Sequence, residues 1–180
     1  MKTFLLGAIA GMIVVPLTVY CYFVSGLAPA ATSAPAMPFE TMLAHKALNA
    51  RIAKEMPMSV PIQADDSNLA AGANIYRHHC AMCHGLPGLP ESPLAKGMFP
   101  HPPKLMEGKG VTDDEPGETY WKVANGIRLT GMPSFRQSLS EAEMWQVSLL
   151  VAHADKLPSA VKDILSAPPF GGPGMNAAPK

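Results

Sequence analysis

An apolar stretch opens the chain. Residues 4–24 carry no charged side chain, and these 21 positions match the roughly 20 that an α-helix needs to cross a bilayer. Secretory apolar regions are shorter, about 7–15 residues, so the pattern favours an uncleaved transmembrane anchor within residues 1–25. Lys2 precedes the stretch and favours a cytoplasmic N-terminus. A cleaved signal sequence is the alternative, because Ala28-Pro29-Ala30 and residues 31–34 offer small-residue cleavage sites. In either case the rest of the chain is exported.

Two further segments place apolar side chains at helical spacing. Over residues 39–56 they recur four residues apart, and over residues 67–79 Leu69, Ala73 and Tyr76 share one helical face. We therefore predict helices in both segments. No segment alternates convincingly between apolar and polar positions, so the predicted fold class is all-α.

Start and stop signals predict two more helices, at residues 116–125 and 141–154. Pro116 suits the first turn of the former helix, and Gly126 suits its end. A capping box formed by Ser140 and Glu143 precedes the latter.

Proline and glycine divide the chain into parts. The 180 residues include 19 Pro and 15 Gly, concentrated between the predicted helices and at the C-terminus. We predict a linker over residues 26–64 that includes the helix at 39–56, a folded domain over residues 65–166, and a disordered tail over residues 167–180. The formal net charge is zero, which gives no reason to expect nucleic acid as a partner.

The sequence Cys80-Ala81-Met82-Cys83-His84 carries the most specific chemistry. C-x-x-C-H is the attachment signal for c-type haem: the two thiols add to the two vinyl groups of the porphyrin, and the histidine becomes the proximal iron ligand. A zinc site would need about four thiolate or imidazole ligands in paired spacing, whereas the one other cysteine is Cys21 in the apolar stretch. A thioredoxin-type pair needs a strand–helix context, but a helix is predicted before Cys80. The motif occurs once, so we predict one covalent haem c.

Residues 65–157 resemble the class I (monohaem) cytochrome c family. Besides the haem motif, Pro103-Lys104-Leu105 is similar to the family's Pro-x-Leu, and Gly131-Met132-Pro133 is similar to the segment that brings the distal methionine. Trp145 on the last predicted helix, opposite Gly72 and Tyr76, supports the resemblance. It implies a small class I helical fold around one covalent haem, here preceded by a transmembrane helix.

Met132 is the predicted sixth ligand of the iron. It lies 48 residues after His84 in a Gly-Met-Pro turn. A thioether is soft and neutral and favours ferrous iron, and a filled sixth position blocks oxygen and peroxide. Other candidates for this position are Met98 and Met106, which could instead cover the haem edge, and His101 and His153. His78 and His79 lie too close to the attachment point to reach the far face of the haem.

Further residues are expected to support the haem. The resemblance assigns the carbonyl of Pro103 to the second ring nitrogen of His84 and packs Leu105 on the haem. Buried propionates need hydrogen-bond donors. The candidate donors are Arg128, Trp121, Tyr120 and Asn125, which lie shortly before Met132.

These features predict a membrane-tethered monohaem cytochrome that transfers single electrons between respiratory or dehydrogenase partners and is not itself an enzyme. It would be held in the cytoplasmic (inner) membrane with its haem domain on the periplasmic side. A tightly bound haem c subunit of a larger membrane respiratory complex is the alternative. A haem enzyme or gas sensor would require an open iron, and hence that Met132 does not bind it.

Overall fold

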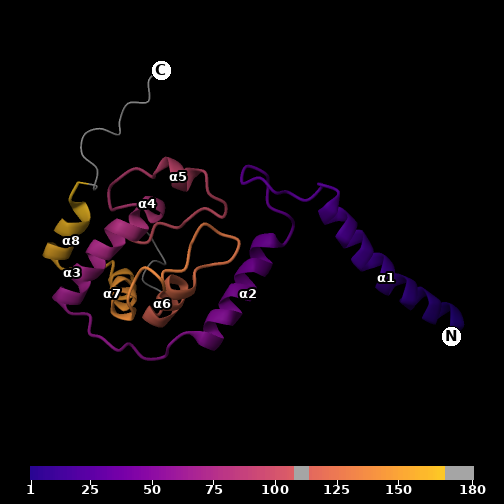
Figure 1. The fold of residues 1–180 in the computed structure, drawn as a ribbon, viewed down its shortest axis with the longest axis horizontal. Coiled ribbons are helices and arrows are strands. Elements are labelled where there is room, and N and C mark those ends of the chain that lie inside the picture. The colour runs from indigo at the N-terminus through magenta and orange to yellow at the C-terminus, as the bar shows by residue number, and fades with distance from the viewer. Residues whose placement is uncertain (108–113, 169–180) are drawn as a thin grey trace, which may run out of the picture. The chain divides into compact units, whose positions relative to one another are not determined.

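The computed structural model describes residues 1–107 and 114–168, and over these residues it is helical and contains no strand. Its elements in chain order are α1 (Lys2–Val24), α2 (Glu40–Glu55), α3 (Asp66–Ile75), η1 (Tyr76–Cys80), α4 (Ala81–His84), α5 (Pro93–Lys96), α6 (Pro116–Asn125), α7 (Glu141–Ala152) and α8 (Ser159–Ser166) (Figure 1). The all-α prediction is confirmed. The predicted tail at 167–180 lies outside the described residues from 169 onward.

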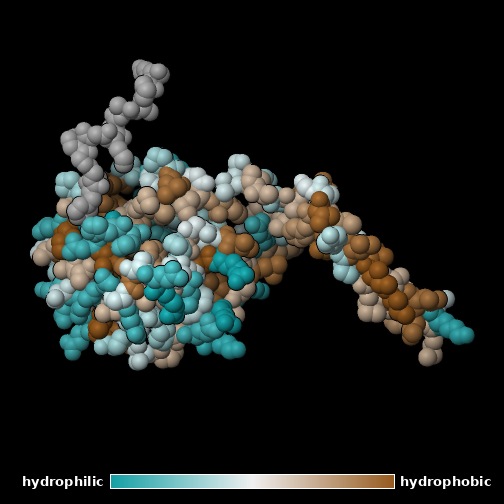
Figure 2. Space-filling view, viewed as in Figure 1, coloured by the Kyte–Doolittle hydropathy of each residue, from teal (hydrophilic) through white to brown (hydrophobic). Residues whose placement is uncertain are grey.

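The chain divides into two compact units, Met1–Ala44 and His45–Lys180. In the first unit, none of the side chains of α1 is buried, and the surface of this helix is apolar along most of its length (Figure 2). Among the described residues, α1 is the one helix that is long and apolar enough to cross a membrane, although a signal sequence would have the same character.

The second unit is built around α7, which packs against both α3 and α6. Most residues of α7 are buried, including Trp145 and Leu150. The ring of Trp145 stacks on the ring of Tyr120 from α6, with centroids 4.2 Å apart. α8 covers α3 and buries Val161 and Leu165. This core holds α3, and therefore the haem motif that follows it, in a fixed place.

The C-terminal half of α2 belongs to the second unit. Ile52 is only 2% exposed, and Trp121 of α6 donates its indole N–H to Glu55 at 3.1 Å. A Cβ on Gly117 would overlap the carbonyl oxygen of Pro57, so the chain leaving α2 lies directly on the start of α6. The predicted helix at 39–56 is therefore present, and its end packs on the domain.

The predicted helices at 116–125 and 141–154 correspond to α6 and α7, and the one at 67–79 to α3 continued by the π-helical turn η1. The short helices α4 and α5 and the eight-residue α8 were not predicted. Arg77 of η1 donates to the backbone carbonyls of Ile164 and Pro168, so the end of α8 is held against the segment that leads into the haem motif.

The crossing of α3 and α7 depends on Gly72. A Cβ there would overlap the carbonyl oxygen of Gln146 and would lie 3.2 Å from Cβ of Leu150. We expect Gly72→Ala to lower the free energy of unfolding by about 1–3 kcal/mol, because neither helix can give way without disturbing the core. Chemical denaturation of the haem-loaded protein measures this change.

Gly97→Ala is the matched control for Gly72→Ala. Its added Cβ would meet nothing closer than the carbonyl oxygen of Leu94 at 3.6 Å, so its effect should stay within about 0.5 kcal/mol. Equal denaturation midpoints for the two variants would contradict the close helix crossing.

Candidate haem site

The cysteines of the motif lie where the helix changes its form. η1 ends at Cys80, and α4 then carries Cys83 and His84. π-helical turns are rare and frequently occur at functional sites. Residues three apart are neighbours on a helix surface, so Cys80 and Cys83, both half-buried free thiols, are one turn apart. Gly85, with φ of +75°, ends α4 directly after His84.

The environment of Cys80 favours a neutral sulfur. Burial, and secondarily the nearby Cys83, raise the pKa of the Cys80 thiol to about 12. The thiol is therefore protonated at neutral pH. A thioether has no proton to lose and carries no charge, so it suits this position equally well.

His84 presents one ring nitrogen for a ligand. Its Nδ1 lies 2.7 Å from the carbonyl oxygen of Pro103, and since a carbonyl can only accept, Nδ1 carries the hydrogen. Burial lowers the pKa of His84, while the hydrogen bond with Pro103 opposes this shift. The neutral ring therefore keeps the lone pair of Nε2 free, which is the form that binds a metal. The structure thus brings His84 and Pro103 together in the geometry that the resemblance implied.

The turn that carries Met132 is held on both sides of this residue. Thr130 Oγ1 accepts from the N–H of Met132 at 3.1 Å, and the carbonyl of Met132 accepts from the N–H of Ile127 at 3.1 Å. Gly126 has φ of +67°, and a Cβ there would lie 2.7 Å from the carbonyl carbon of Pro133. The half-buried side chain of Met132 packs against the hydrophobic core. Its thioether is thus presented from a fixed backbone.

The residues after Met132 return the chain to α6. Ser134 donates its hydroxyl to the carbonyl of Ala124 at 2.6 Å, and the N–H of Phe135 donates to the carbonyl of Val123 at 3.0 Å. The Gly-Met-Pro turn is therefore a closed loop on the C-terminal end of α6.

Comparison with protein families gives a match to this domain. Residues 67–149 match the family model described as cytochrome C oxidase, cbb3-type, subunit III. The domain is a c-type cytochrome. As such it binds haem c and transfers electrons.

A solved structure is similar to part of this chain. A chain of the reducing HAO-like protein complex of Kuenenia stuttgartiensis is 26% identical, with a TM-score of 0.47, over 56% of this chain and 49% of that chain. This chain thus spans about half of the length of that one. No curated protein matches the chain.

The described residues of this c-type cytochrome fit a covalent haem. The structure offers two half-buried thiols one turn apart, a neutral imidazole whose Nε2 is free, and a thioether on a fixed turn. Leu105, half-buried, packs against the same hydrophobic core as Cys80 and Met132.

The predicted propionate donors do not form one group. The single N–H of Trp121, a predicted propionate donor, donates to Glu55. Tyr120 is buried and stacked on Trp145. Asn125 donates its side-chain amide to the carbonyl of Trp121 at 2.9 Å. Arg128 is exposed and remains the cationic candidate.

Three of the histidines considered as alternative ligands lie next to a backbone carbonyl or a carboxylate of the same domain. Nδ1 of His78 lies 2.7 Å from the carbonyl of Asn74, and Nδ1 of His153 lies 2.9 Å from the carbonyl of Leu149. His101 lies 2.5 Å from the carboxylate of Glu91. These contacts are local to the surface segments that carry them.

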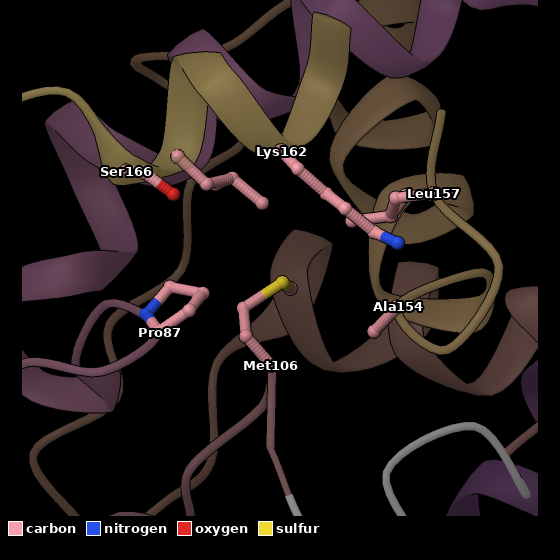
Figure 3. A pocket seen from close by; sticks show the side chains of 7 residues that line it. Pro87, Met106, Ala154, Leu157, Lys162 and Ser166 are labelled. Atoms are coloured by element: carbon pink, nitrogen blue, oxygen red, sulfur yellow. The ribbon is translucent and has the colours of Figure 1, made fainter. Parts of the chain in front are cut away.

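Met106, the other methionine considered in the loop after the haem motif, lines a pocket of about 220 Å³ with Pro87, residues of α8 and residues of the segment between α7 and α8 (Figure 3). Lys162 and Leu157 also line this pocket. The described residues that line this pocket include neither a residue of the haem motif nor Met132. The pocket is therefore separate from the side chains proposed to hold the haem.

Sequence reasoning missed the residues that support the Met132 turn. Thr130 and Gly126 hold its backbone. A threonine hydroxyl that caps a turn two residues away is a known local signal, so Thr130 could have been found. The packing of Gly126 against Pro133 could not, because it depends on how the loop closes.

Proposed function

We propose that this protein is a membrane-tethered monohaem cytochrome that passes single electrons between protein partners. The observation that carries the proposal is the pair of ligand groups: His84 with Nε2 free because Nδ1 binds Pro103, and Met132 on a turn held by its backbone. An iron held by both residues would have no open position for oxygen or peroxide, and the chemistry that it would supply is electron transfer.

Each residue has a distinct part in this proposal. When bound, the haem supplies an iron that alternates between the ferric and ferrous states. Cys80 and Cys83 would each hold it by one thioether, and the single C-x-x-C-H supports one haem. His84 Nε2 and Met132 Sδ would bind the iron.

The remaining proposed contacts tune and cover the haem. The carbonyl of Pro103 fixes the ring orientation of His84 and raises its basicity. Leu105 would pack on the haem. Arg128 supplies a charge-assisted hydrogen bond to a propionate.

The tether would raise the local concentration of the cytochrome domain at the membrane. α1 would lie in the cytoplasmic membrane, with Lys2 on the cytoplasmic side. Haem attachment to C-x-x-C-H is extracytoplasmic, so the cytochrome domain would lie on the periplasmic side. A short link to the membrane raises the effective concentration of the domain near membrane-bound donors and acceptors without any new contact.

A tightly bound subunit of a larger respiratory complex is the second candidate. It is favoured by the description of the matching family, which names a subunit of an oxidase. The haem chemistry is the same in both cases, and only the mobility differs.

Purification of the native protein from membranes tests the proposal. We expect it to stay with the membranes after a carbonate wash, to begin at or near Met1, and to carry the mass of one haem. The ferrous protein should bind carbon monoxide poorly, because Met132 fills the sixth position. In mild detergent a free carrier runs alone, whereas a subunit co-purifies with its complex.

A variant in which a cleavable signal sequence replaces residues 1–25 is the control for the tether. It should be released into the soluble fraction with an unchanged haem spectrum. A native protein that begins near Ala31 would show instead that a signal peptidase removes α1. Ready carbon monoxide binding by the wild type would favour an enzyme or a gas sensor.

A further inference from the structure

The loop between the haem motif and Pro103 contains a connection from the motif to the Met132 turn. The hydroxyl of Ser92, which caps α5, donates to the carbonyl of Met82 inside the C-x-x-C sequence at 2.6 Å. The same oxygen accepts from the N–H of Ala95 at 3.1 Å. α5 also packs beside α4 (Figure 1). The start of α5 is therefore fixed to the segment that would bind the haem.

Met98 lies two residues beyond the end of α5, and its N–H donates to the carbonyl of Ala95 at 3.2 Å. The end of its side chain rests on Gly131. A Cβ built on Gly131 would overlap Cε of Met98 and lie 3.5 Å from Sδ. The half-buried Met98 thus contacts Gly131, the residue directly before Met132.

Backbone hydrogen bonds hold the inner side of the Met132 turn. On its outer side Gly131 and Pro133 are exposed to solvent. An unbranched thioether side chain adapts well to such an irregular surface. Contact with Met98 favours the closed turn over any arrangement that moves Gly131 away. Ser92 and α5 provide the fixed base from which Met98 reaches the turn.

We propose that Met98 is a positioning residue that holds the Met132 turn closed, so that the proximal motif and the distal methionine are connected through Ser92 and α5. This proposal rests on the proposed role of Met132 as the distal ligand. It assigns to Met98 a packing role and not a bond to iron.

Carbon monoxide binding to the ferrous protein measures the opening of the turn. Carbon monoxide binds only when Met132 has left the iron, so its apparent affinity is scaled by the fraction of open molecules. We expect Met98→Ala to raise this affinity about tenfold, the equivalent of about 1.4 kcal/mol, and to weaken the sulfur-to-iron band of the ferric protein. Met98→Leu keeps the packing volume and should stay close to the wild type.

Met106→Ala is the matched control. Met106 is also a half-buried methionine of the same loop, but it lines the pocket beside α8 (Figure 3). Its truncation should lower the thermal stability and leave the band and the carbon monoxide affinity unchanged. An equal rise in affinity in Met98→Ala and Met106→Ala would reflect general loosening of the loop and would overturn the proposal.

Gly131→Ala tests the same contact from the other side and does not remove any atom of Met98. Its new methyl group takes the place of Cε of Met98, so Met98 must move and the carbon monoxide affinity should rise. In the Met98→Ala background the same methyl group fills the space left behind. The double variant should therefore lie closer to the wild type than Met98→Ala does, and simple additivity of the two effects would contradict the contact.

The outcomes separate this inference from the proposed function. If the wild type lacks the sulfur-to-iron band, Met132 is not the ligand and the proposed function fails first. If the wild type has the band and Met98→Ala keeps both the band and the affinity, only the positioning role is wrong. If Met98→Leu behaves like Met98→Ala, the sulfur of Met98 is required and the packing role is overturned.

Discussion

Replacing Cys80 and Cys83 together by Ser is expected to abolish covalent haem in this protein. A hydroxyl does not add to a porphyrin vinyl group under the conditions in which a thiol does, so neither thioether forms. Both thiols are half-buried, so a haem attached to them would be partly buried as well. It would then supply part of the core of a small domain. We therefore expect the double variant to accumulate poorly. Haem staining of a denaturing gel, normalised to protein, measures the attachment.

Cys21→Ser is the matched control for this experiment. Cys21 is an exposed residue of α1, far from the motif in sequence, and its loss should leave the haem stain at the wild-type level. Each single variant, Cys80→Ser or Cys83→Ser, keeps one thioether and should give an intermediate or low signal. Full staining of the double variant would show that attachment does not use these sulfurs.

The sequence predicted the longer helices because their signals are local. Pro116 and Gly126 mark the two ends of α6, and Ser140 with Glu143 forms the capping box that begins α7. The C-x-x-C-H motif is likewise complete within five residues. A feature whose cause lies within one or two turns of chain can be found without a structure.

The short elements could not be found in the same way. α4 and α5 contain four residues each, which is too short for a hydrophobic period to show. α8 did carry a signal, since Val161 and Leu165 lie four residues apart after Pro158, and the sequence reading overlooked it. The π-helical turn η1 has no such local signal in its sequence.

Contacts between residues far apart in the sequence carry no local signal. Trp121 was one candidate donor to a propionate, and in the structure its N–H donates to Glu55, 66 residues earlier in the chain. That contact exists because the end of α2 packs on α6, which helical periodicity in residues 39–56 does not indicate. The contact of Met98 with Gly131 could not be predicted from the sequence either, because it also joins two segments that are far apart in the chain.

Met132→Ala is expected to separate the proposed electron carrier from a haem protein with an open iron. Without its thioether the ferric protein should lose the weak sulfur-to-iron band near the red end of the spectrum. The reduction potential should fall, because the ligand that favours ferrous iron is gone. A fall on the order of 0.1 V or more would lie well within the roughly 0.8 V over which axial ligands set haem potentials.

The variant pair Met132→Ala and Met132→His separates loss of the soft ligand from loss of any ligand. Both should lose the sulfur band and have lower potentials. Met132→Ala should bind carbon monoxide readily, whereas Met132→His should bind it poorly because an imidazole fills the sixth position. Covalent haem should be unchanged in both, because Cys80, Cys83 and His84 remain. If Met132→Ala keeps the band and the potential, the distal sulfur belongs to Met98 or Met106, and the closed turn at Gly131 must serve another purpose.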